Sequence, residues 1–196
     1  MKIKLKKMAD AQTGYSFRVR IEPDSNGSLA VIQMKDLRAD NTVDLSSLTR
    51  VDLPELKSHH LVEPGDLIFR SRGLETSAAM LSENPGQAIV SAPLLRIRVK
   101  KAAKILPEYL NWYLSQSPAQ AYFNSYAIGT AQKIINKEVL EELEIFVPTL
   151  RMQKKIVELA ALAESEQKLT EKISEKRKQY VSALLMQAAK GEADER

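Results

Sequence analysis

The segment of residues 149–190 is "TLRMQKKIVELAALAESEQKLTEKISEKRKQYVSALLMQAAK". It contains no proline or glycine, and Thr149 is a residue type that caps helices, so it predicts one long helix. At 1.5 Å per residue this helix would be roughly 60 Å long. Residues spaced alternately three and four apart form a heptad seam with two polar interruptions. The seam residues are Leu159, Leu162, Glu166, Leu169, Ile173, Lys176, Tyr180 and Ala183.

A helix of this length cannot bury its seam against one small domain, and the chain offers no second long helix. The seam therefore predicts a coiled coil with a partner chain or with a second copy. Glu166 and Lys176 could pair across an antiparallel homodimer and fix its register. The alternative is a solvated helix that lies on its own domain. The tail "GEADER" (191–196) is expected to fray.

Residues 1–148 predict an α+β domain of mixed strands and short helices. Alternating or short apolar runs predict strands, and they lie at 15–21, 28–34, 67–69, 88–92, 94–100 and 144–147. Helices are expected at 106–117 and 118–127, and Asn136 is expected to cap a short helix that follows it. In the strand 94–100, Arg96, Arg98 and Lys100 share one face, which we expect to be solvated.

Composition limits the class of protein. The chain has 196 residues, and 44% of them are apolar, which suits one domain plus an appendage. It has no apolar run long enough to span a membrane, and "MKIKLKKMAD" (1–10) lacks the apolar block of a secretory signal. The net charge of +4 permits an anionic partner such as nucleic acid without requiring one. A cytoplasmic location is expected.

The residue types needed for common catalytic sites are scarce. Cysteine is absent, which excludes disulfides, thiolate nucleophiles and cysteine zinc sites. The only histidines, His59 and His60, are adjacent, so their side chains diverge, and a polar loop is a better interpretation than a metal site. The glycines form no phosphate-binding loop. We therefore expect no catalytic residue, metal or cofactor in this chain, and an enzyme with an unrecognised site is the least favoured hypothesis.

Two polar clusters could contact nucleic acid. The first, in "FRSRGLETS" (69–77), comprises Arg70, Ser71, Arg72, Thr76 and Ser77. The second, in "GTAQK" (129–133), comprises Thr130, Gln132 and Lys133. Arg and Lys can bind guanine edges or phosphate, and Gln can pair with adenine. The alternatives are a turn with solvated arginines for the first cluster and a loop packed between helix and strand for the second.

Three stretches in this order resemble the specificity (S) subunit of type I restriction-modification systems. They are "VEPGDLIFRSRG" (62–73), "ILPEYLNWYLSQ" (105–116) and "AIGTAQKIINKEVLEELEIFVPTLRMQKKIVEL" (127–159). Their order and spacing carry the resemblance, which covers roughly residues 60–185. Residues 1–59 fit only loosely, and "VIQMKDL" (31–37) is the best match there.

The resemblance implies that residues 1–148 are a target-recognition domain for double-stranded DNA and that 149–190 form the coiled coil. A usual S subunit has two such domains and two long helices, whereas this chain has one of each. It therefore looks like a half-size form, which implies an antiparallel homodimer that reads a split inverted repeat. The resemblance also implies partners: methyltransferase (M) subunits, which carry S-adenosylmethionine, and through them restriction (R) subunits. The alternative is a coiled-coil assembly or decoy protein that binds the M subunit without reading DNA.

Overall fold

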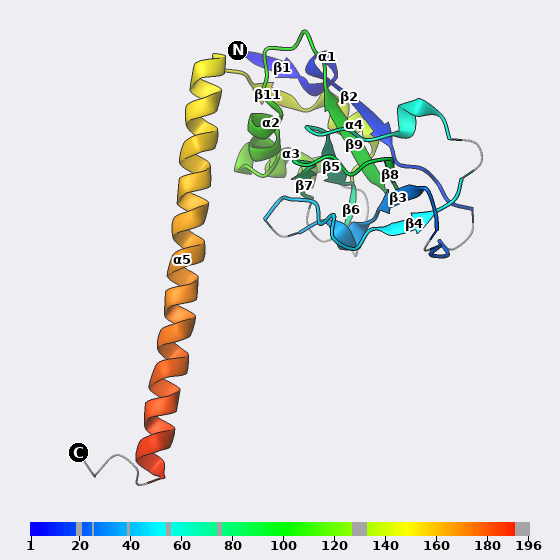
Figure 1. Cartoon of the computed structure of the whole chain (residues 1–196). Helices are drawn as coiled ribbons and strands as arrows, with labels where there is room; N and C mark the ends of the chain where they lie inside the picture. The colour runs from blue at the N-terminus through cyan, green and yellow to red at the C-terminus, as the bar shows by residue number, and fades with distance from the viewer. Residues whose placement is uncertain are drawn as a thin grey trace. The chain divides into compact units, whose positions relative to one another are not determined.

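The computed structural model describes residues 1–18, 21–24, 26–38, 40–53, 56–73, 76–126 and 133–190, without the side chain of Lys133. The chain divides into two units, Met1–Lys154 and Lys155–Arg196. The predicted fold class is confirmed, because mixed strands and short helices precede a long helix, α5 (Leu150–Ala189) (Figure 1). None of the described helices is both long and apolar enough to cross a membrane.

The largest sheet of the first unit has four antiparallel strands. In sheet order they are β2 (Ala9–Thr13), β9 (Leu94–Val99), β5 (Leu67–Arg70) and β7 (Ala78–Met80) (Figure 1). Leu67 pairs with Ile97, and Phe69 pairs with Leu95, so the predicted apolar strands lie side by side in the middle of this sheet. Both central strands are buried over most of their length, as expected where each face of a sheet is covered.

A second sheet has three strands in the order β4 (Thr49–Val51), β3 (Leu29–Ile32) and β8 (Ala88–Val90). β3 pairs antiparallel with β4 and parallel with β8. Every residue of β3 and β8 is buried. Because β-strand side chains alternate, Ala30 and Ile32 join one core cluster with Ile68, whereas Leu29 and Val31 join another with Val51.

Two short ribbons complete the strand pairing. One joins β1 (Lys2–Lys4) to β11 (Glu144–Phe146), and the other joins β6 (Arg72–Gly73) to β10 (Lys133–Ile134). The helical elements are α1 (Leu5–Met8), η1 (Met34–Asp36), η2 (Ser58–His60), α2 (Pro107–Leu114), α3 (Ser117–Tyr126) and α4 (Lys137–Glu142). Pro107 begins α2, where its missing N–H costs nothing. The predicted cap of α4 is confirmed, because Asn136 Oδ1 accepts a hydrogen bond of 2.8 Å from the backbone of Val139.

The strand predicted at 15–21 is wrong. Tyr15 makes one isolated bridge with Ser91, and the described residues that follow form no strand. Tyr15, Phe17 and Ile21 pack beside the cluster of Leu29 and Val31, so their alternation reflects burial without a strand ladder. Among the described strands, the sequence did not reveal β1, β2, β4, β6, β7 and β10. β1 and β2 pair with β11 and β9, which lie far along the chain.

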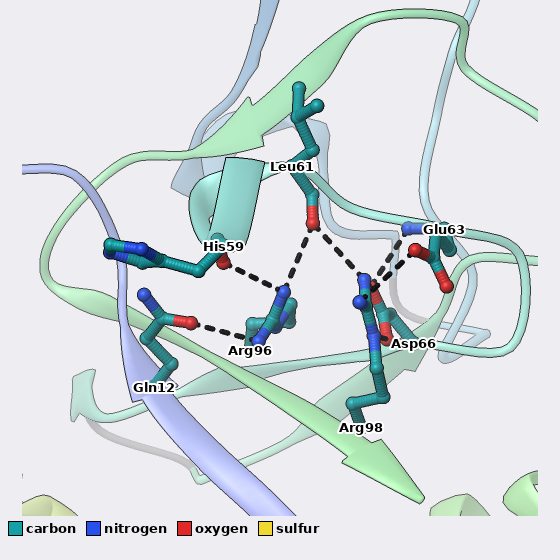
Figure 2. A network of polar contacts seen from close by, with 7 residues as sticks. All are labelled: Gln12, His59, Leu61, Glu63, Asp66, Arg96 and Arg98. Atoms are coloured by element: carbon teal, nitrogen blue, oxygen red, sulfur yellow. Dashed lines mark hydrogen bonds and ion pairs between the residues drawn. The ribbon is translucent and has the colours of Figure 1, made fainter. Parts of the chain in front are cut away.

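The face of β9 that carries Arg98 is not solvated as predicted. Arg98 donates from Nε and Nη2 to the two carboxylate oxygens of Asp66, each at 2.7 Å, and from Nη2 to the carbonyl of Leu61 at 3.0 Å (Figure 2). Asp66 is 1% exposed and also accepts from the backbone N–H of Glu63 at 2.8 Å. The hydrogen bonds that Arg98 donates to Asp66 raise the pKa of Arg98, as expected for a bidentate pair.

Arg96 belongs to the same network, because it lies two residues before Arg98 on the same face of β9. It donates from Nη1 to the carbonyls of His59 and Leu61, both at 3.0 Å, and from Nη2 to Gln12 Oε1 at 2.8 Å (Figure 2). Its side chain is buried, and burial lowers its pKa. Both arginines therefore attach the segment 59–66 to the sheet, immediately before β5, the strand that leads to the first polar cluster.

The first turn of α5 is built into the first unit through Gln153. This side chain is 0% exposed. Its Oε1 accepts from the backbone of Leu106 at 2.9 Å, and its Nε2 donates to the carbonyls of Lys104 and Pro148, both at 2.9 Å. Thr149 caps the helix with a long contact of 3.4 Å to the Met152 N–H. Gln153 thus joins the helix start to the segment before α2.

Candidate nucleic-acid interface

The two predicted polar clusters meet in the ribbon of β6 and β10. Arg72 pairs with Ile134, and Gly73 pairs with Lys133. The Ile135 N–H also donates to the carbonyl of Ser71 at 2.8 Å. Gly73 has a φ of 146°, which L side chains rarely adopt, so the ribbon favours glycine here. Residues far apart in sequence that were predicted separately to contact nucleic acid therefore lie on adjacent strands.

The exposed part of this ribbon carries Arg72, whose side chain faces solvent. Lys133 occupies the facing strand, but its side chain is outside the described residues. Thr130 and Gln132 also lie outside the described residues. The placement of the GTAQK cluster as a DNA contact therefore stays a prediction.

Two members of the first cluster turn inward. Ser71 is 6% exposed and donates its hydroxyl to the carbonyl of Pro93. Thr76 is 7% exposed, and its hydroxyl donates to Gln120 Oε1 at 2.9 Å. Gln120 returns a bond of 3.1 Å to the Thr76 carbonyl and also donates to the carbonyl of Leu114 at 2.7 Å. These hydroxyl donors are engaged within the domain, which ties the loop after β6 to the junction of α2 and α3.

Arg70 and Ser77 line an open cleft of about 570 Å³, to which Thr76 also contributes. The cleft is lined by Leu37, Arg38, Asn41, Arg70, Thr76, Ser77, Ser115 and Gln120. The backbone of Arg70 donates to the carbonyl of Ser77 at 2.8 Å, which holds these two residues opposite each other at the strand ends. The cleft gathers residues from three parts of the chain, and sequence reasoning named only Arg70, Thr76 and Ser77 among them.

The wall that the sequence did not reveal comes from the loop 37–43. Leu37 and Val43 close this loop with an isolated bridge, and Asn41 takes a φ of 59°, in the left-handed region that asparagine tolerates. The carbonyl of Asn41 accepts from the backbone of Met80 at 2.8 Å. The stretch "RADNT" (38–42) does predict a turn, but its position beside β7 depends on contacts that the turn signal does not contain.

The charges of the cleft are unequal. Arg38 Nη2 lies 2.7 Å from the carboxylate of Asp44, and the pair raises the pKa of Arg38. Hydrogen bonds from Ser46 and then from Arg38 hold the pKa of Asp44 well below its usual value. Arg70, by contrast, has no hydrogen bond or ion pair from its side chain to the described residues, and its Nε is covered by protein. The cleft therefore contains the guanidinium of Arg38, which is paired with Asp44, and that of Arg70, which has no such partner among the described residues.

Metal chemistry has no visible basis in this part of the chain. Among the described residues, no group of three or more His, Cys, Asp or Glu side chains could hold a metal ion. The side chains of His59 and His60 do not diverge as expected, because their ring centroids lie 4.2 Å apart with the planes tilted by 43°. Burial lowers the pKa of His60. What the first unit offers is a cationic ribbon and a polar cleft, which suit an acceptor-rich partner.

Residues 1–177 match the family model of the type I restriction modification DNA specificity domain. The chain belongs to this family. The resemblance predicted from three sequence stretches is therefore confirmed, and the chain is a member of the specificity-subunit family of type I restriction-modification systems. No curated relative matches this sequence.

Solved structures of specificity subunits share the fold of this specificity domain. The HsdS subunit from Thermoanaerobacter tengcongensis has 18% identity and a TM-score of 0.54, over 86% of this chain and 37% of that one. The S subunit from M. genitalium has 12% identity and a TM-score of 0.55, over 84% and 39%. A chain from a study of complex assembly in the type I R-M system has 18% identity and a TM-score of 0.59, over 96% and 43%. This chain thus spans less than half the length of each.

Proposed function

We propose that this specificity domain is a DNA-recognition subunit that acts as an antiparallel homodimer and reads a split inverted repeat. The observation that carries the proposal is the exposed apolar seam of α5. Its large residues are open to solvent: Leu159 68%, Leu162 69%, Leu169 61%, Ile173 67% and Tyr180 65%. So many exposed apolar side chains in one heptad pattern are expected to be covered by another helix.

The seam residues support an antiparallel arrangement. If Glu166 of one copy faces Lys176 of the other, the neighbouring layers follow from the heptad spacing. Leu169 then faces Ile173, Leu162 faces Tyr180, and Leu159 faces Ala183. Every layer is either apolar or oppositely charged. A parallel pair in register would place Glu166 against Glu166 and Lys176 against Lys176, and both layers would be repulsive.

Two-fold symmetry sets the form of the target. Each copy contributes one recognition domain of the same sequence, so the two domains read the same half-site on opposite strands. A helix of 40 residues is about 60 Å long, so the two helix starts of an antiparallel pair would lie roughly that far apart. The predicted site is therefore an inverted repeat interrupted by a spacer.

The same proposal assigns catalysis to other chains. The M subunits would dock on the homodimer and supply S-adenosylmethionine, and the R subunits would join through them, in the cytoplasm. Two buried hydroxyls, those of Ser71 and Thr76, favour the alternative of an assembly or decoy protein, because they remove two of the predicted DNA contacts. Selection of DNA from a random pool with the M subunit present separates the two: an inverted repeat supports recognition, and no enrichment supports the alternative.

The helix pairing can be tested directly because the chain has no cysteine. Leu162→Cys and Tyr180→Cys are prepared as separate chains, mixed and oxidised. Antiparallel pairing predicts a crosslink only in the mixture, because the two copies of residue 162 would lie about 27 Å apart. A parallel pair would crosslink each chain with itself. No crosslink together with a solution mass of 22.0 kDa would overturn the homodimer.

A further inference from the structure

The most unusual polar group of the recognition domain is the guanidinium of Arg70. Side chains alternate along β5, so Arg70 lies on the same face as Ile68, at the edge of a core cluster that includes Leu37. Its Nε is buried and has no hydrogen-bond acceptor within the described chain. A buried charged donor without an acceptor is costly, and folded proteins rarely retain one without a reason.

Arginines elsewhere in the domain show how this chain normally satisfies such a group. Arg98 makes a bidentate pair with Asp66, and Arg96, although its Nε is also unpaired, places both Nη atoms on protein oxygens. Arg70 has neither arrangement among the described residues. Within the described chain no bond holds the Nη groups of Arg70, and these are the atoms that an external acceptor in the cleft would meet.

The space beside Arg70 is suited to such an acceptor. The cleft of about 570 Å³ is within the usual range of ligand sites. Its described lining contains two arginines, two amides and three hydroxyls, and no carboxylate is among these described residues. Of these, Thr76 and Gln120 bond each other, and the Ser115 hydroxyl donates to the carbonyl of Trp112 at 2.7 Å, so Arg70 and the hydroxyl of Ser77 remain to meet a ligand. The site therefore favours a group rich in acceptors.

We propose that this cleft receives one nucleotide of each DNA half-site, with Arg70 as its principal charged donor, while Ser71 and Thr76 only hold the loop. This inference rests on the proposed DNA-recognition function and deepens it. Arg70 would contact either a guanine base or a phosphate of this nucleotide. Both present two acceptor atoms in one plane: N7 and O6 of guanine, or two oxygens of a phosphate. Arg38, held by Asp44, forms the opposite wall of the cleft.

The test compares wild type, Arg70→Gln and Arg70→Lys in complex with the M subunit, using DNA selected by the wild-type complex. Arg70→Gln is expected to weaken binding by about 10- to 100-fold. Arg18→Gln, which changes an exposed arginine outside the cleft, is the matched control and is expected to bind like wild type.

The two sources of the acceptor give different results. If Arg70 reads guanine, Arg70→Gln relaxes one position of each half-site, and Arg70→Lys does not restore it because lysine lacks the planar fork. If Arg70 holds phosphate, the selected sequence stays the same. The slope of log affinity against log salt then falls by about one per half-site, and Arg70→Lys retains most of the binding.

A measurement without DNA guards against a folding defect. Since Arg70 donates no side-chain hydrogen bond within the described chain, Arg70→Met is expected to keep or raise the thermal midpoint. A large fall in that midpoint would overturn the inference by assigning Arg70 to the fold. Unchanged affinity, sequence and salt slope in Arg70→Gln would also overturn it and leave the proposed function standing. A wild-type complex that selects no DNA would overturn the proposed function itself.

Discussion

The helix α5 has two regions that the same chain treats in opposite ways. In its first turn, Gln153 is 0% exposed and makes three hydrogen bonds to backbone groups of the first unit. Further along, Leu159 is 68% exposed, and the apolar positions that follow it remain open. The contrast is an inversion of the usual rule, since the polar residue is inside and the apolar residues are outside.

This contrast separates the interactions that the chain makes within itself from those that need a second chain. Gln153 satisfies donors and acceptors that belong to its own unit, so it specifies where the helix begins. The seam has no such partner among the described residues of the chain, so it specifies an association. Four experiments test these assignments, beginning with the seam.

Ile173→Glu is expected to have the largest effect. In the antiparallel arrangement it places a carboxylate against Leu169 in two layers next to the symmetry axis, so the dimer dissociation constant should rise by more than about 100-fold. Light scattering should report a mass near 22.0 kDa in place of about 44 kDa, twice the chain mass. Ser174→Glu, on the outer face, is the control and should remain dimeric. An Ile173→Glu chain that stays dimeric would show that the seam does not form the interface.

Gln153→Leu tests the buried end of the helix. It removes the partners of the Leu106 N–H and of the Lys104 and Pro148 carbonyls, so the free energy of unfolding should fall by about 3 kcal/mol. Urea unfolding in the Ile173→Glu background measures the unit without a dimer contribution. Met152→Ala changes a half-exposed neighbour and should cost about 0.5 kcal/mol or less. Equal stability of the two variants would mean that Gln153 does not anchor the helix.

Charge reversal tests the register of the seam. Glu166→Lys alone and Lys176→Glu alone should each weaken the dimer by about 1 kcal/mol per layer, because like charges then face each other. The double variant exchanges the two signs and should recover most of the wild-type affinity. Sedimentation at several concentrations measures this. Additive losses in the double variant would exclude a register in which residues 166 and 176 face each other.

The sequence predicted the elements whose signal is local. The apolar runs of β5 and β9, the proline that begins α2 and the cap at Asn136 each act within a few residues, and the structure confirms them. The pairing of β1 with β11 was not predicted, because a few alternating residues at the start of the chain do not indicate a partner near residue 145. The segment 15–21 also alternates, but among its described residues only Tyr15 makes a bridge, with Ser91.

The candidate interface was also only partly predictable from the sequence. Polar residue types identified the two clusters, and the ribbon of β6 and β10 brings together their described parts. Nothing local indicated that the hydroxyls of Ser71 and Thr76 bond within the domain, or that Arg70, at the end of β5, lines a cleft with distant residues. The opposite wall, Arg38 and Asn41, required knowledge of which distant loop packs beside β7.

The smallest expected effect is an acid dependence of the first unit. Glu142 accepts hydrogen bonds from Lys4 and Lys6, which lower its pKa from 4.5 to about 2 and tie α4 to the chain start. Because the folded pKa is depressed, this stabilisation is fully present above about pH 4.5 and is lost as the pH falls through about 2.

The measurement is the difference in thermal midpoint between wild type and Glu142→Gln, taken in the Ile173→Glu background. Wild type should be more stable at pH 5, and the difference should shrink as the pH falls and vanish only below the folded pKa of about 2, where the neutral side chains form similar contacts. Other carboxylates titrate in both proteins and cancel in the difference. Glu158→Gln, on the exposed part of α5, should leave the midpoint unchanged throughout. A pH-independent difference for Glu142→Gln would mean that the lysine contacts contribute through packing and not through charge.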